Sequence, residues 1–252
     1  MPPQRKMPIK NTVKIYAGDG YYHIYNRGVN KQQIYFQVSD YKYFLFLMKI
    51  YLINPRLAQQ ELLKYNPKIL YIPHNYFQKL SVICFCLMPN HFHLIIRQTE
   101  PHTIEYFMRS LMTNYVLYIN RKYNRCGPLF QSSYKGILIT DDNYLLHLTR
   151  YIHLNPIDLG PQKPISYPYS SYQWYISNVH TEWFNPSAVL NFFDHKPIFV
   201  PREIASYQSF VDDYKKDPPA GLNELLIDSE EVPPLRGGTS KGSENNIRKL
   251  NV

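Results

Sequence analysis

The chain has 252 residues, 44% of them hydrophobic, which is enough to bury the core of one large domain. It contains no apolar run long enough to cross a bilayer, no signal peptide and only three cysteines, so we expect a cytoplasmic protein without membrane association or disulfide framework. A formal charge of +9 and 24 tyrosines favour a nucleic-acid partner, because basic groups neutralise phosphates and flat rings stack on unpaired bases. The alternative is a basic but otherwise ordinary enzyme with tyrosines in its core.

Composition divides the chain into four segments. Residues 1–17 are polar and rich in proline and lysine, and we expect a flexible basic arm. Residues 18–160 carry the apolar periodicities of one folded domain. Residues 161–215 are irregular and aromatic, and we expect them to pack on that domain as a C-terminal extension. Residues 216–252 are dominated by proline, glycine, serine and charge, which predicts little fixed structure.

Strands and helices are predicted in a definite order within the domain. A strand at 21–25 leads into turn chemistry at 26–28, where Gly28 is free to adopt a positive φ. The later elements are an extended piece at 33–36, helices at 41–52 (with Ser39 and Asp40 as N-cap) and 58–64, strands at 80–87 and 91–97, a long helix from Thr103, a strand at 136–140, and a helix capped by Asp141 and Asp142. This order predicts an α+β, ferredoxin-like (split βαβ) antiparallel sheet with helices on one face.

Two histidines head the second strand of the predicted hairpin. His91 and His93 flank Phe92, and side chains alternate between the two faces of a strand, so both imidazoles project from the same face. Two imidazoles held in this way on rigid backbone can share one divalent metal ion. The alternative is a pair of histidines on the solvated face of an edge strand, because short motifs often match by chance.

A phenol and an amide share one side of the following helix, in the motif RYIHLNP (150–156). Tyr151 and Asn155 are four positions apart and are therefore neighbours on a helical face. Beside a divalent cation the phenol can attack phosphorus, and the Asn155 oxygen can complete a Mg²⁺ or Mn²⁺ site begun by His91 and His93. Pro156 opposes this interpretation because it biases Asn155 away from helical geometry. In that case the motif is only a helix stop, and Tyr151 is a core tyrosine.

Five motifs in this order resemble the single-tyrosine HUH transposases, most closely their REP-associated tyrosine transposase branch. They are 22–28 (YHIYNRG), 88–94 (MPNHFHL), 130–136 (FQSSYKG), 150–156 (RYIHLNP) and 167–172 (YPYSSY). The resemblance covers about residues 20–175. It implies a ferredoxin-like nuclease fold, a divalent metal, and cleavage and strand transfer of single-stranded DNA near hairpins through a 5′-phosphotyrosine intermediate.

The resemblance also assigns roles to individual residues. His91 and His93 match the metal-binding pair, Tyr151 the nucleophile, and Asn155 the third ligand, which is often glutamine in relatives. The choice of Tyr151 among the tyrosines rests on the resemblance, and Tyr144 is the next candidate. The basic residues expected to hold DNA are Arg27, Lys31, Arg121, Lys122, Arg125 and Lys135. Relatives include monomers and dimers that exchange the tyrosine helix, so both states remain open.

Two other functions fit part of the sequence. The first is a hairpin DNA-binding protein without cutting activity, which a phosphotyrosine adduct would exclude. The second is a metal-dependent hydrolase of small phosphoesters that uses the histidine pair without a covalent step. The basic charge and the lack of acidic residues near the histidines argue against the hydrolase.

Overall fold

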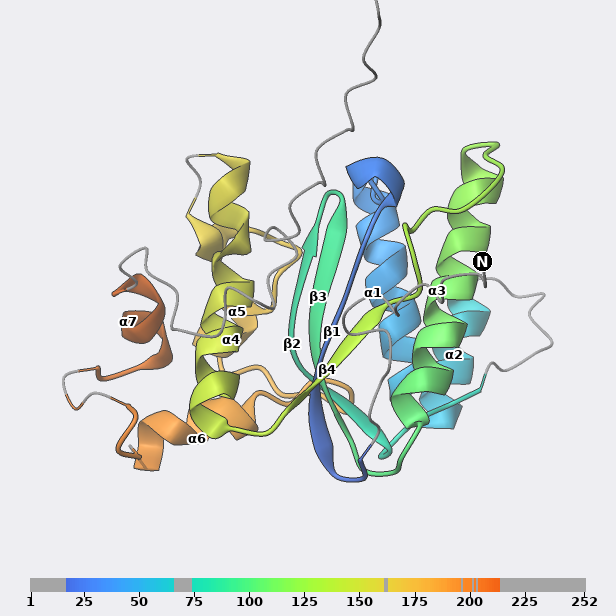
Figure 1. Ribbon diagram of the computed structural model, residues 1–252. Helices are drawn as coiled ribbons and strands as arrows, with labels where there is room; N and C mark the ends of the chain where they lie inside the picture. Colours follow the sequence, from blue (N-terminus) through green and yellow to red (C-terminus); the bar gives the residue numbers. More distant parts are fainter. Residues whose placement is uncertain are drawn as a thin grey trace, which may run out of the picture. The chain divides into compact units, whose positions relative to one another are not determined.

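A four-stranded antiparallel sheet, in the order β2-β3-β1-β4, forms the centre of the computed structural model (Figure 1). The structure describes residues 17–65, 74–160, 163–195, 197–200, 202 and 204–213. The strands are β1 (Gly20–Arg27), β2 (Leu80–Met88), β3 (His91–Gln98) and β4 (Lys135–Ile139). This is the strand order of a split βαβ fold, so the predicted α+β architecture is confirmed. The predicted arm (apart from Ala17), the tail at 216–252 and the connection at 66–73 lie outside the described residues.

Three helices cover one face of the sheet (Figure 1). They are α1 (Val38–Leu52), α2 (Pro55–Tyr65) and α3 (Thr103–Lys122), at the positions that the apolar periodicity predicts. The ring of Phe44 on α1 lies 5.4 Å from that of Phe92 on β3, between centroids, and 5.0 Å from that of Tyr115 on α3. All three side chains are buried, so this face of the sheet forms the main core.

The opposite face of the sheet is also covered by helices (Figure 1). These are α4 (Asp142–Leu154), α5 (Tyr172–Ile176) and α6 (Ser187–His195), and α7 (Tyr207–Asp212) packs on α4 on the side away from the sheet (Figure 1). The prediction of helices on one face therefore describes α1 to α3 only. The physical reason lies in β2, whose sequence LSVICFCLM is apolar at nearly every position. A continuous apolar strand is buried on both faces, so it needs a cover on each side.

The C-terminal extension runs along β2, the strand at one edge of the sheet. The backbone N–H of Leu87 donates to the carbonyl of Tyr169, and that of Val82 to the carbonyl of Trp183, each at 2.9 Å. These bonds satisfy backbone groups that a bare edge would expose to pairing with another chain. Tyr167, Tyr172 and Tyr175 are buried, so this aromatic cluster packs against the domain.

Three local predictions differ from the structure. Residues 33–36 form no strand. Helix α1 begins at Val38, with Gln37 as its N-cap, and Asp40 accepts the backbone N–H of Gln37 at 2.9 Å instead of capping from outside the helix. Gly28 has a φ of −62°, so it is not needed for a positive φ. A Cβ atom there would collide with the carbonyl oxygen of Gln32, and this close approach of backbone requires glycine.

None of the helices in the described part of the chain combines the length and the apolar character that crossing a bilayer requires.

Candidate active site

The two histidines of β3 project toward α4. The centroids of the His91 and His93 rings are 5.2 Å apart, and the ring of Tyr151 on α4 lies edge-on to that of His93 at 5.7 Å. Phe92, between the histidines, points to α1 on the other face. His91 is 6% exposed and His93 is fully buried, which excludes the alternative of two histidines on a solvated face. One chain therefore brings the histidine pair and the Tyr151 ring together.

Helix α4 is placed by its cap and by its apolar stripe. The carboxylate of Asp141 accepts the backbone N–H of Tyr144 at 2.7 Å and starts the helix. Leu145, Leu148 and Ile152 are buried, and the same packing leaves Tyr151 half-buried. The hydroxyl of Tyr144 is enclosed by protein, so DNA cannot reach it in this conformation. The contact of Tyr151 with His93 therefore favours Tyr151 over Tyr144 as the phenol of this site.

Asn155 keeps helical geometry despite the proline that follows it. Its φ and ψ are −47° and −40°, and the chain continues as a 3₁₀ turn, η2 (Asn155–Leu159). The expectation that Pro156 displaces Asn155 from helical geometry is therefore wrong. The side-chain amide of Asn155 donates to the carbonyl oxygen of Tyr151 at 2.9 Å, which turns its Oδ1 atom toward β3.

The hydrogen bonds around His91 leave two lone pairs facing each other. The amide of Asn90 donates to the carbonyl oxygen of Lys31 at 3.1 Å, so its Oδ1 atom must accept from Nδ1 of His91 at 2.7 Å. In neutral His91 the Nε2 atom then carries no hydrogen. That atom lies 3.3 Å from Oδ1 of Asn155, which is also an acceptor. Only a cation or an added proton makes this approach favourable.

The ring of His93 lies beside these atoms, with its centroid 5.2 Å from that of His91. Burial, followed by the nearby His23, His91 and Arg27, holds the pKa of His93 well below its usual range, so its ring is neutral. Its Nδ1 atom is 2.9 Å from Nε2 of His23, and its Nε2 atom has no hydrogen-bond partner among the described residues. Burial also lowers the pKa of His23 to about 3.

The nitrogen atoms of His91 and His93 and the oxygen atom of Asn155 are suitable ligands for a divalent cation. The described residues contain no group of three or more His, Cys, Asp or Glu side chains that could hold a metal ion, and the atom beside the two histidines that could serve as a third ligand is Oδ1 of Asn155. Two imidazole nitrogens and one amide oxygen suit Mn²⁺ better than Mg²⁺, which prefers oxygen ligands. Neutral imidazoles are the form that binds metal, and the depressed pKa of His93 keeps it in that form.

Two of the six predicted DNA-binding residues lie beside the histidines. Arg27 pairs with His91 in the register of β1 and β3. Lys135 on β4 pairs with Tyr25, its Nζ atom lies 5.7 Å from the centre of the Tyr25 ring, and that ring stacks on His93 at 6.0 Å. Burial lowers the pKa of Lys135. The site therefore has a cationic group on each side of the histidine pair.

The other four predicted residues lie away from the histidines. Lys122 is held in an ion pair with the buried carboxylate of Asp40 at 2.7 Å and also donates to Ser39 at 2.6 Å. Burial opposes the charge of Asp40, but hydrogen bonds from Lys122, Tyr123 and the backbone keep its pKa below the usual value. Lys122 thus has a structural role. Exposed Lys31 and Arg121, and the half-buried Arg125, are available at the surface.

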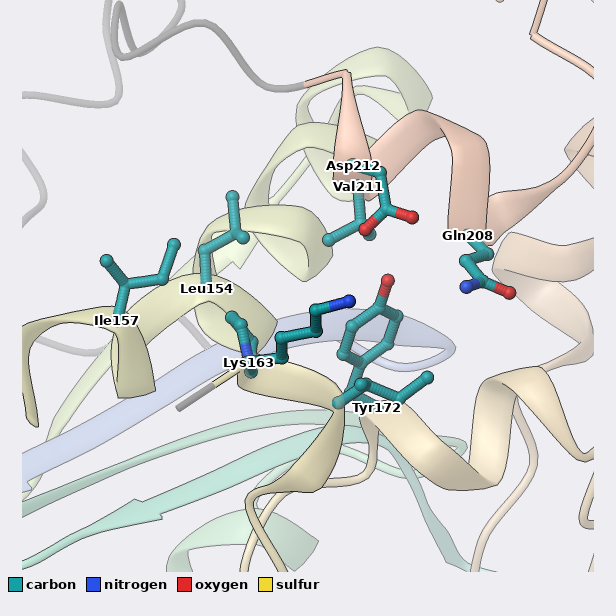
Figure 2. A pocket seen from close by; sticks show the side chains of 9 residues that line it. Leu154, Ile157, Lys163, Tyr172, Gln208, Val211 and Asp212 are labelled. Carbon is teal, nitrogen blue, oxygen red and sulfur yellow. The ribbon is translucent and has the colours of Figure 1, made fainter. Parts of the chain in front are cut away.

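A hollow of about 360 Å³ lies at the C-terminal end of α4 (Figure 2). Apolar side chains such as Leu154 and Ile157 form one wall, and the ammonium group of Lys163 reaches toward Tyr172 and Asp212. Burial, followed by the nearby carboxylate of Asp212, raises the pKa of the Tyr172 hydroxyl. Sequence analysis missed this hollow because its walls come from segments distant in the chain.

Part of the chain matches a known protein family. Residues 61–155, which contain both histidines, Tyr151 and Asn155, match the family described as IS200-like transposases, and the resemblance predicted from the sequence is confirmed. Among solved structures, the chain is similar to a REP-associated tyrosine transposase bound to a REP hairpin, with 11% identity and a TM-score of 0.47. That similarity covers 70% of this chain and 92% of the other. The comparison with curated proteins found no match.

Proposed function

We propose, from the match of residues 61–155 to IS200-like transposases, that this protein is a metal-dependent tyrosine transposase that cleaves and rejoins single-stranded DNA beside hairpins. The observation that carries the proposal is the convergence of acceptor atoms from His91 and Asn155 at 3.3 Å, next to the rings of His93 and Tyr151. When bound to these three residues, a divalent cation such as Mn²⁺ or Mg²⁺ supplies electrophilic polarisation of the scissile phosphate.

The side chain of Tyr151 supplies the nucleophile. Its phenol oxygen forms a bond to phosphorus, the bond from phosphorus to the 3′ oxygen breaks, and the phenol proton leaves with that oxygen as a 3′ hydroxyl. The 5′ phosphate stays on Tyr151 as a phosphotyrosine. Attack by another 3′ hydroxyl reverses these bond changes and completes strand transfer. The number of phosphodiester-type bonds is conserved, so the reaction needs no external energy source.

DNA binding follows from the charges around this site. Arg27 and Lys135 flank the histidines and contact the phosphates next to the scissile one. Lys31, Arg121 and Arg125 extend the basic surface, whereas the charge of Lys122 is offset by Asp40. The hollow at Lys163 takes an unpaired nucleotide of the single-stranded extension, because it combines apolar walls with the ammonium group of Lys163 (Figure 2).

One chain carries all the candidate catalytic and metal-binding residues. Tyr151 contacts His93 of its own chain, so cleavage does not need a tyrosine helix from a partner. A monomer is therefore sufficient for the first chemical step, and the reaction takes place in the cytoplasm, where the DNA substrate lies.

Formation of a covalent adduct tests the proposal. A hairpin DNA with a single-stranded 5′ extension, incubated with the protein and Mn²⁺, is expected to give a denaturant-resistant protein–DNA product. Tyr151→Phe should abolish this product, and Tyr144→Phe, on the same helix, should retain it. An adduct in Tyr151→Phe would discard the assignment. Hairpin binding without an adduct in the wild type would favour the silent DNA-binding protein, and hydrolysis of a small phosphoester undiminished by Tyr151→Phe would favour the hydrolase.

A further inference from the structure

A histidine occupies an apolar position in the middle of the sheet. His23 on β1 is fully buried and faces α4, and its partners across the two neighbouring strands are Ile95 and Ile137. A branched aliphatic side chain would fill such a position without burying polar atoms. Buried polar groups in folded proteins are normally hydrogen-bonded, but Nδ1 of His23 has no partner among the described residues. The polar side chain at this position therefore calls for an explanation other than packing.

Among the described residues, His23 makes one polar contact, which is with His93. Nε2 of His23 lies 2.9 Å from Nδ1 of His93, both rings are buried, and their planes differ by 14°. His23 also stacks on Tyr25 at 4.8 Å, which fixes the orientation of its ring. The two nitrogens share one proton, so the hydrogen bond can run in either direction. The direction of this hydrogen bond determines whether Nε2 of His93 carries a hydrogen.

The two directions have different consequences for metal binding. When Nδ1 of His93 carries the proton and donates it to His23, Nε2 of His93 keeps a lone pair that faces His91 and Tyr151. When His23 is the donor, Nε2 of His93 must carry a hydrogen and cannot bind a metal. His91 is oriented in the same way. Oδ1 of Asn90 accepts a hydrogen bond from Nδ1 of His91, and Nε2 of neutral His91 therefore carries no hydrogen.

We propose that His23 is a positioning residue that accepts the hydrogen bond from Nδ1 of His93 and holds that imidazole in the tautomer able to bind a divalent cation. The inference rests on the proposed function and adds a residue outside the matched segment 61–155. Groups that orient metal-binding histidines in this way are worth about 10- to 100-fold in metal affinity.

The arrangement has a signature that a structural role would not give. In the metal-binding tautomer, His23 keeps its own hydrogen on Nδ1, where the described residues offer no acceptor. Removing the imidazole then relieves a buried, unsatisfied donor, so the fold loses little or gains stability. A purely structural histidine would show the reverse, with lower stability and unchanged metal affinity.

Two substitutions separate these outcomes. His23→Gln places an amide oxygen where it can accept from His93, and His23→Met keeps the volume but removes the acceptor. Mn²⁺ affinity, measured by electron paramagnetic resonance, is expected to fall about 10- to 100-fold in His23→Met and to stay within about threefold of wild type in His23→Gln. The melting temperature of metal-free His23→Met should equal or exceed that of the wild type.

A packing control and a direct observation of the proton complete the test. Ile95→Val trims the side chain opposite His23 and should leave Mn²⁺ affinity unchanged. In the Zn²⁺-loaded wild type, ¹⁵N NMR should find the shared proton on Nδ1 of His93. A proton on Nε2 of His23, or wild-type Mn²⁺ affinity in His23→Met, would overturn the inference and leave the proposed function standing. Failure of the wild type to bind Mn²⁺ would instead refute the metal site itself, and the inference with it.

Discussion

Nε2 of His91 faces Oδ1 of Asn155 across 3.3 Å, and the other hydrogen bonds of the two side chains make both atoms acceptors. Such a contact is unfavourable unless a positive charge lies beside it. The ring of His93 lies beside them, and its Nε2 atom, which has no partner among the described residues, adds a third lone pair in the tautomer proposed above. The ring of Tyr151 stands next to them, where the proposed reaction needs its phenol.

Substitution at Asn155 tests the third ligand. Asn155→Ala removes the oxygen donor, and its dissociation constant for Mn²⁺ should rise by at least about tenfold. Asn155→Asp keeps an oxygen donor and adds a negative charge, so its affinity should equal or exceed that of the wild type. Isothermal titration calorimetry gives both values, with His180→Ala, a change at an exposed histidine, as the control. Equal affinities of Asn155→Ala and wild type would remove Asn155 from the site.

Local periodicity accounted for the parts of this site, and long-range packing decided how they meet. Alternation along β3 predicted that His91 and His93 share a face, and helical spacing predicted that Tyr151 and Asn155 do. Their meeting depends on α4 covering the face of the sheet away from α1. The nearly continuous apolar sequence of β2 contained that information, because a strand with this pattern needs cover on both faces.

Other features depend on contacts that the local sequence pattern does not predict. His23 and His93 are 70 positions apart, and their hydrogen bond exists only because β1 and β3 are neighbours in the sheet. The ion pair of Lys122 with Asp40 joins α3 to the first turn of α1, so a residue predicted to bind DNA proved to be engaged in the fold. Pro156 disfavours a helical Asn155 locally, and the hydrogen bond of Asn155 to Tyr151 overrides that preference.

Removing the charge of Lys122 should lower the stability of the protein, whereas removing the charge of Arg27 should weaken DNA binding. Lys122→Met leaves the buried carboxylate of Asp40 without its ionic partner, although Tyr123 and two backbone N–H groups still donate to it. The free energy of unfolding should therefore fall by about 2 kcal/mol, with little change in DNA affinity. Arg27→Gln should instead weaken DNA binding and reduce the slope of log affinity against log salt by about 1. Urea denaturation and fluorescence anisotropy at several salt concentrations measure the two effects, and a reversed pattern would contradict the assignment.

Stability should fall in acid because of His153. Its ring is buried in contact with Tyr207 at 2.7 Å and Ser171 at 2.8 Å, and burial lowers its pKa to about 3. The unfolded chain binds a proton at the ordinary pKa near 6.5. The stabilisation is therefore complete above pH 6.5 and is lost as the pH falls toward 3. At pH 5 the loss from this group alone is about 2 kcal/mol.

Urea denaturation at pH 7.5 and pH 5.0 measures this dependence. His153→Gln should be less stable than the wild type at pH 7.5, because it disturbs the contacts with Tyr207 and Ser171. Its stability should, however, change less between the two pH values. An undiminished pH dependence in the variant would assign the acid sensitivity to other groups.

The hollow at the end of α4 makes a prediction about single-stranded DNA. Lys163→Met removes the ammonium group from the hollow and should weaken binding of a hairpin that carries an unpaired extension. Binding of the same hairpin without the extension should not change. Lys79→Met, at an exposed lysine that pairs with Glu100 elsewhere on the molecule, is the matched control. Equal losses for both DNAs would show that Lys163 acts only through general charge.

The most direct measurement is the anomalous difference density of Mn²⁺ in crystals of the wild-type protein. The account predicts one peak bound by Nε2 of His91, Nε2 of His93 and Oδ1 of Asn155, with the hydroxyl of Tyr151 beside it. A peak at other side chains, or no peak among these three atoms at a concentration that supports DNA cleavage, would contradict it.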